Sequence, residues 1–299
     1  MAKIRSSGTW GSALSTDEFA AIRSVGFEPV GQVLGAAVYN LGYRGYGCPS
    51  FGSFGSFSRF QPGWQQSSTA VSSSGQSATY APLVQTLYAA RRAALARMSA
   101  ECAQLGGHGV VGVLLTIGRF PAGGLEFKAI GTAVRAHGGG ALRQPFTSDV
   151  SGQDFAKLIT DGAVPVGLAL GISIGTRHDD WQTIGQSRWT TGNTEVTGYT
   201  ELVNMTRHDA RTELHSDVQR MGADGVVIQR MDMRISEQEC PAVEGRRDHI
   251  AEVTIVGTAL THFARSRRAA ERPSLAVVSL DPQRRQAARV RLGGGTGSR

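Results

Sequence analysis

The sequence repeats itself, and this internal repeat limits the possible folds more than any other feature of the chain. Four pairs of matching blocks carry the repeat: SxxxFA at 15–20 and 151–156, PVGxxLG at 29–35 and 165–171, Ala94–Val111 and Ala210–Val227, and AIGTAV at 129–134 with IVGTAL at 255–260. The blocks keep their order in both halves, and only the spacings between them differ. A duplicated unit with loops of different length is therefore predicted.

Each copy is expected to be a small α+β unit. Ser15 and Glu18 form a capping box, which predicts a short helix from about Thr16. The segment 29–39 then has the pattern of a strand, and its internal glycines indicate a bulge or the close approach of another backbone. A long helix with an apolar stripe is predicted over 82–105, followed by a glycine stop and two strands. So few strands cannot bury the helix and both faces of a sheet, so association between units is expected.

The domain organisation follows from the repeat. The first domain is predicted at 15–136 and the second at 151–264, with a linker at 137–150. A Gly/Ser/Phe-rich insertion at 44–79 has no core periodicity, which favours a flexible surface loop. The alternative for this insertion is that its phenylalanines and tryptophan contact a partner.

The formal net charge of +7 comes from one segment. Residues 265–299 contain nine arginines and two acids, so the preceding part of the chain is neutral. A solvated, disordered tail is the favoured interpretation. The alternative is a polybasic arm for nucleic acid, an anionic membrane or an acidic partner, and such binding would be non-specific because no aromatic residues interleave with the arginines.

Other global features favour a soluble, cytoplasmic protein. No apolar run approaches the roughly 18–20 residues that a transmembrane helix needs. The N-terminus is basic but lacks the apolar stretch of a secretory signal. The three cysteines are scattered, which argues against a disulfide framework.

The order of the repeated blocks resembles the YbjQ family. The resemblance rests on PVGxxxG, on a helix ending in LGG-x-GVVG or MGADGVV, and on a strand ending in GTAV, over 19–136 and 155–263. It implies a compact α+β fold that forms rings, with pentamers as the associated form. The family is labelled for heavy-metal binding, but the resemblance brings neither a ligand set nor a catalytic mechanism. This chain departs from the simple pattern by its tandem arrangement, its insertion and its basic tail.

Five residues are the candidate metal ligands, and a divalent or heavy metal ion is the cofactor considered. His178, Asp179 and Asp180 form a polar cluster directly after a predicted strand. Cys240 and His249 flank the loop of the last hairpin, across which they are expected to approach each other. Ordinary loop chemistry is the alternative for both groups, because the sequence lacks CxxC, HxxxH and HExxH motifs.

Other histidines and cysteines are assigned structural roles. His208 and His215 share a helix face but lie about 10 Å apart along the axis, which is too far for one ion. Cys102 lies on the apolar stripe and is expected in the core. His108 and Asp224 occupy the same position of the two copies and are predicted to be exposed turn residues with no required chemistry.

The sequence favours a non-enzymatic function. No GxSxG motif, P-loop or strand-coupled GxGxxG motif is present, and we expect that the acids and histidines are not duplicated at equivalent positions. The duplicated features are glycines, apolar stripes and strand ends, and these specify fold and assembly. The first hypothesis is therefore an oligomeric scaffold or small-ligand-binding protein. The alternatives are a heavy-metal-binding or sensing protein with sites at subunit interfaces, and an adaptor acting through its basic tail.

Overall fold

The computed structural model describes residues 11–41, 69–72, 80–138, 144–188, 192–240 and 247–262. All of these residues belong to one compact unit. The helices are α2 (Thr16–Ser24), α3 (Ala81–Gln104), α4 (Gly152–Thr160), α5 (Trp181–Ser187) and α6 (Thr197–Arg220). The strands are β1 (Phe27–Tyr39), β2 (Thr69–Val71), β3 (Gly109–Arg119), β4 (Leu125–Ala136), β5 (Phe146–Thr147), β6 (Ala163–His178), β7 (Gly225–Glu239) and β8 (Arg247–His262). The predicted tail, 265–299, lies outside the described residues.

Each copy forms its own sheet, so the predicted pair of α+β units is confirmed. Sheet 1 has the order β1-β4-β3-β5 and sheet 2 has the order β2-β6-β8-β7. In both sheets the first long strand pairs antiparallel with the last, which also pairs with the strand that follows the long helix. The two copies therefore have the same topology, which is a strand, a long helix and a hairpin.

Two local predictions are confirmed, the first in one copy and the second in both. The capping box of Ser15 and Glu18 starts α2, with hydrogen bonds in both directions. Gly106 and Gly222 follow the ends of α3 and α6 with φ angles of 72° and 66°. This left-handed conformation strains residues with a side chain, so glycine ends each long helix at the same point.

Glycines in the first strand of each copy let the long helix approach the sheet closely. A Cβ atom added at Gly35 would lie 2.0 Å from the carbonyl oxygen of Ala94 in α3. A Cβ atom at Gly171 would lie 2.1 Å from the carbonyl oxygen of Ala210 in α6. The predicted close approach is thus the helix of the same copy, while the neighbouring Gly31 and Gly167 adjoin irregularities in the strand pairing.

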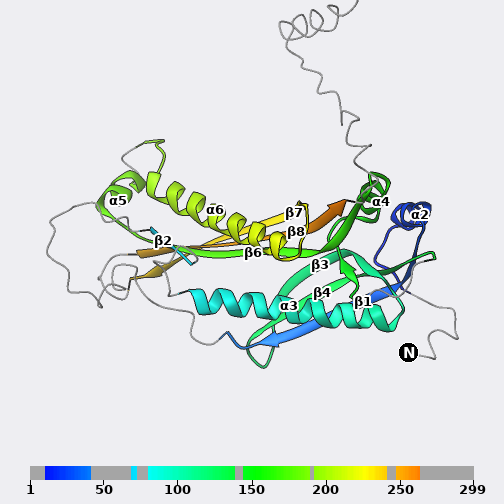
Figure 1. The fold of residues 1–299 in the computed structure, drawn as a ribbon. Coiled ribbons are helices and arrows are strands. Elements are labelled where there is room, and N and C mark those ends of the chain that lie inside the picture. Colours follow the sequence, from blue (N-terminus) through cyan, green and yellow to red (C-terminus); the bar gives the residue numbers. More distant parts are fainter. Residues whose placement is uncertain are drawn as a thin grey trace, which may run out of the picture. The chain divides into compact units, whose positions relative to one another are not determined.

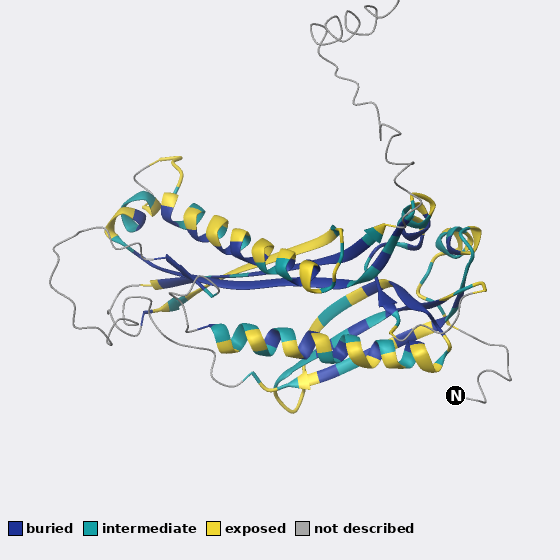
Figure 2. Cartoon of the chain, viewed as in Figure 1, coloured by how far each residue is buried: buried dark blue, intermediate teal, exposed yellow. Residues whose placement is uncertain are grey.

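α3 packs on one face of sheet 1 and also contacts β6 of sheet 2, and α6 covers the other face of sheet 2 (Figure 1). The main core contains the buried face of α3, the inner face of sheet 1 and the near face of sheet 2. A second cluster joins the other face of sheet 2 to α6. β6 is therefore buried along most of its length, whereas β7 is exposed (Figure 2). The first copy supplies cover for the second, as the shortage of strands predicted.

Two short strands cross between the copies, which the sequence did not predict. Residues 69–71 of the predicted loop insertion form β2, a buried strand that pairs with β6 of the second copy. Residues 146–147 of the predicted linker form β5, which runs parallel to β3 of the first copy. These parts of the insertion and the linker are therefore structural, and the rest of the insertion, 44–68 and 73–79, lies outside the described residues.

The prediction that His108 and Asp224 are exposed turn residues is wrong for His108 and confirmed for Asp224. His108 is buried, and its Nδ1 accepts a hydrogen bond from the backbone N–H of Ala136 at 3.1 Å. Asp224 is exposed, and its carboxylate accepts from the backbone N–H of His262 at 3.0 Å. These two amides occupy matching positions in the last strand, so both copies need an acceptor here.

The claim that acids are not duplicated is also wrong. Glu101 of α3 accepts a hydrogen bond from the backbone N–H of Leu34 at the open edge of β1. Asp217 of α6 accepts from the N–H of Leu170 at the matching edge of β6. Because an edge strand leaves backbone donors unpaired, the duplicated acid has a structural role in both sheets.

Candidate functional site

A group of buried polar residues lies at the end of sheet 2 where β6 and β7 end and β8 begins. His178 is the last residue of β6, Asp248 is the second residue of β8, and Cys240 directly follows β7. Their exposed fractions are 8%, 0% and 6%. The three strand ends meet because β8 pairs with both β6 and β7, with His178 directly opposite Asp248.

Three potential ligand atoms converge at this point. One atom each from His178, Cys240 and Asp248 lies within 4.8 Å of the others. Nδ1 of His178 is 2.8 Å from a carboxylate oxygen of Asp248, which fixes the orientation of the imidazole ring. Residues of one strand alternate between the faces of a sheet, so this cluster lies on the face opposite α6.

The donor set fits a divalent transition metal. Thiolate, imidazole and carboxylate are the three ligand types that Zn²⁺ takes in proteins, at metal–ligand distances of about 2.0–2.3 Å. A histidine hydrogen-bonded to a carboxylate is also the usual arrangement behind a metal-binding imidazole. His178 therefore suits either direct ligation beside Asp248 or ligation through Nε2 with Asp248 behind it.

A second polar network occupies the α6 face at the same end. The hydroxyl of Tyr199, near the start of α6, donates to Asp179 at 3.2 Å and lies 2.9 Å from Nε2 of His249. A carboxylate oxygen of Asp179 also lies 3.1 Å from Nε2 of His249. Burial and the nearby charge of Asp179 raise the pKa of Tyr199 to about 12, so its hydroxyl remains a donor at neutral pH. This network attaches the start of α6 to the sheet.

A third network surrounds Arg177. Its guanidinium group contacts Thr69 of β2, Glu201 of α6 and Asp180. Asp180 also caps α5, accepting a hydrogen bond from Thr183 at 2.7 Å. Although partial burial opposes the shift, the hydrogen bonds from Thr183 and the charge of Arg177 hold the pKa of Asp180 below its ordinary value.

The five predicted ligands are thus divided among three networks. His178 and Cys240 come together, although they were assigned to different groups. Asp179 and His249 meet in the Tyr199 network, and Asp180 binds Arg177. The sequence prediction missed Asp248, because its place beside His178 depends on strand register.

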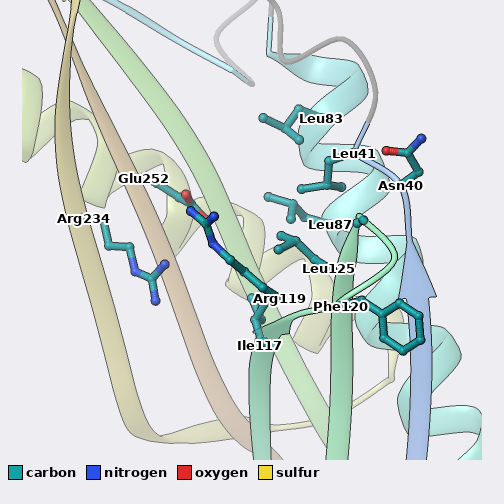
Figure 3. A pocket seen from close by; sticks show the side chains of 13 residues that line it. Asn40, Leu41, Leu83, Leu87, Ile117, Arg119, Phe120, Leu125, Arg234 and Glu252 are labelled. Carbon is teal, nitrogen blue, oxygen red and sulfur yellow. The ribbon is translucent and has the colours of Figure 1, made fainter.

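A pocket of about 560 Å³ lies at the boundary between the two copies. Leucines of the first copy line one side, while Arg119, Arg234 and Glu252 lie on the other (Figure 3). The described residues that line the pocket include no cysteine or histidine, so they offer no second set of soft metal ligands.

Other sequence predictions are tested by exposure. Cys102 is completely buried, as expected for a core residue, and burial raises its thiol pKa to about 11. His208 and His215 are exposed on α6, as expected. Within the described ranges, none of the helices has both the length and the apolar character needed to span a membrane.

Comparisons with known proteins agree with the duplicated fold. A family model described as "Putative heavy-metal-binding" matches residues 68–137 and 166–262. A Mycobacterium tuberculosis protein named "Encapsulin nanocompartment protein Rv1762c" is 34% identical over 232 residues, covering 72% of this chain and 75% of that protein. No solved structure matches the chain.

Proposed function

The chain belongs to the YbjQ family, and from this premise we propose that it is a non-enzymatic protein that binds a divalent metal ion through His178, Cys240 and Asp248. The observation that supports this proposal is the convergence of three different ligand types within 4.8 Å at a buried position. The family description gives independent support for a metal ligand.

The residues of the chain have separate tasks in this site. Cys240 supplies the thiolate, which favours Zn²⁺ and softer ions over Mg²⁺ or Ca²⁺. Asp248 offsets the positive charge and orients the ring of His178. Three protein ligands leave a fourth tetrahedral position for water or another small ligand, and the bound metal would supply a Lewis-acidic centre there.

The site is tested by titrating Zn²⁺ into the full chain after removal of metal with a chelator. We expect one equivalent to bind in the wild type, and Cys240→Ser and His178→Gln each to weaken binding by at least about tenfold. Co²⁺ provides a second readout, because thiolate ligation gives a charge-transfer absorption that Cys240→Ser removes.

His249→Gln is the matched control, since it changes a buried histidine next to Asp248 that lies in the other network. This variant is expected to keep the zinc affinity and the Co²⁺ spectrum. Unchanged zinc binding in Cys240→Ser would reject the proposed site.

A second function, an assembling scaffold, is favoured by the distribution of exposed apolar side chains. Most of those among the described residues lie on two surfaces, the open face of sheet 1 and strand β7, whereas Trp181 and Met205 lie on helices. The residues are Leu34, Val38 and Leu114 on the first surface and Met231, Met233 and Ile235 on the second. Large apolar patches on both surfaces are typical of proteins that associate.

The name of the mycobacterial relative places that protein in a nanocompartment. We propose for this chain only that it assembles with copies of itself. Light scattering at micromolar concentration is expected to give a multiple of the 31.7 kDa chain mass. A mass of one chain would reject the scaffold function while leaving metal binding open to its own test.

A further inference from the structure

The packing between the two copies provides a template for packing between chains. One face of α3 covers sheet 1 of its own copy, and the other covers sheet 2 of the second copy. Arg91 spans both sheets, with its guanidinium 5.6 Å from the ring centroid of Phe127 in sheet 1 and 3.5 Å from Thr254 in sheet 2. Sheet 2 is therefore closed on this side by the long helix of the preceding copy.

Specific polar contacts accompany this packing at the edge of β6. The Tyr88 hydroxyl of α3 donates to the carbonyl of Leu170 and accepts from the N–H of Ile172. Arg92 of α3 forms a 3.1 Å ion pair with Asp217, the acid that caps Leu170. Helix α3 therefore contributes two side chains to this edge. Tyr88 both donates and accepts hydrogen bonds, and Arg92 pairs with Asp217.

Sheet 1 has the same face and edge but lacks such cover among the described residues. Leu34 and Val38 of β1 are each 47% exposed, and Leu114 of β3 is 44% exposed. Leu34 occupies the position of Leu170, and its N–H is capped by Glu101, which occupies the position of Asp217. The open face of sheet 1 is therefore the counterpart of the face of sheet 2 that α3 covers.

The outward face of α6 carries suitable groups at the matching positions. Asn204 corresponds to Tyr88 and His208 corresponds to Arg92, and both are exposed. An asparagine amide both donates and accepts, as Tyr88 does, and a histidine can pair with Glu101 as Arg92 pairs with Asp217. Arg207 corresponds to Arg91.

Strand β7 adds an apolar surface beside α6. Met231 and Met233 are 44% and 43% exposed and correspond to Leu115 and Ile117 of β3. Leu115 and Ile117 line the space between the first copy and sheet 2, facing Arg234 and its neighbours on β7. By the same geometry, Met231 and Met233 would face β3 of another chain.

The segment before each copy repeats the pattern. Ser148 lies over sheet 2, with its hydroxyl 3.1 Å from that of Thr258, and its carbonyl accepts from Val113 in β3. Ser12 lies over sheet 1, with its hydroxyl 3.4 Å from that of the matching Thr132. In a chain-to-chain contact, the Ser12 segment would lie along β7 as the Ser148 segment lies along β3.

We infer that the chain binds a second copy of itself head to tail, with α6 and β7 of one chain covering the open face of sheet 1 of the next. The contact continues the interface that already joins α3 to sheet 2, and it rests on the scaffold function proposed above. Its two sides are different surfaces, so repetition produces a ring where the rotation closes.

The test blocks one side at a time. Leu34→Asp places a charge on the open face of sheet 1, and Met233→Asp places one on β7. Each variant is expected to lose the wild-type mass by light scattering. Mixed in equal amounts, the two are expected to form a heterodimer of twice the chain mass, because each keeps the surface that the other has lost.

Val38→Asp and Met231→Asp are the second variants for the two sides, and circular dichroism confirms that each is folded. Trp181→Asp is the control, because Trp181 is 76% exposed on α5, a helix without a counterpart among the described residues of the first copy. It is expected to retain the wild-type mass.

The outcomes separate this inference from the function on which it rests. A monomeric wild type would overturn both the scaffold function and the head-to-tail contact. An oligomeric wild type whose mass survives all four interface variants overturns only the contact. Disruption by the sheet 1 variants alone would also overturn it, because it would indicate a symmetric contact between two sheet 1 faces.

Discussion

Replacing Gly171 with alanine tests whether the close packing of helix on strand sustains the second copy. The new Cβ atom would lie 2.1 Å from the carbonyl oxygen of Ala210 and 3.0 Å from the backbone nitrogen of Leu214. Both contacts are backbone atoms in the middle of α6, so a side-chain rotation cannot relieve them. The helix must move away from β6 by about 1 Å.

Overpacking of this kind costs about 3 kcal/mol, at the upper end of the usual range because backbone must move. Alanine also lowers the entropy of the unfolded chain, which returns about 0.4–1 kcal/mol. The net loss is about 2 kcal/mol. For a unit of this size, each kcal/mol shifts Tm by about 2–4 °C, so a decrease of about 4–8 °C is expected.

Gly167→Ala is the matched control, because the nearest atom to its new Cβ would be the sulfur of Met221 at 3.7 Å. Thermal unfolding followed by circular dichroism, at one protein concentration, compares the two variants. A Tm for Gly171→Ala equal to or above that of Gly167→Ala would refute the packing argument.

Two further predictions concern ionisable groups. The thiol of Cys102 is buried and its pKa is raised to about 11, so iodoacetamide at pH 8 is expected to label it far more slowly in the native chain than in urea, as peptide mass spectrometry would measure. Equal labelling rates would contradict the burial of this residue. Burial also raises the pKa of Asp149, so its protonated form stabilises the fold below the unfolded pKa of about 3.8, and this contribution is lost as pH rises through the folded value. Urea unfolding should therefore show Asp149→Asn gaining stability relative to the wild type between pH 4 and pH 7, and a constant difference across this range would rule out the explanation.

The sequence alone determined the parts of the fold that depend on neighbouring residues. The capping box at Ser15, the helix stops at Gly106 and Gly222, and the apolar stripe of each long helix are local signals. They lie where expected, except that Met205 of the second stripe is exposed. The duplication made the helix stops and the stripes more secure because each occurred twice. It also identified Gly35 and Gly171 as places where another backbone approaches.

The candidate site was only partly accessible from the sequence. His178 and Cys240 were recognised as candidate ligands, but the structure groups them with each other and with Asp248, which was not among the candidates. Adjacent strand residues face opposite sides of a sheet, so Asp248 and His249 enter different networks. Which of the two meets His178 depends on the register of β8, and the loop sequence does not specify that register.

Tertiary structure alone decided how the two copies are joined. Strands β2 and β5 are too short to carry a periodic pattern. β2 is stabilised by β6 of the second copy, and β5 of the linker is stabilised by β3 of the first copy. The acceptor roles of Glu101 and Asp217 likewise depend on strand edges distant in sequence. Local chemistry fixes where helices and strands begin and end, but the partner of an edge, a face or a side chain is set by contacts that form only when the two copies pack together.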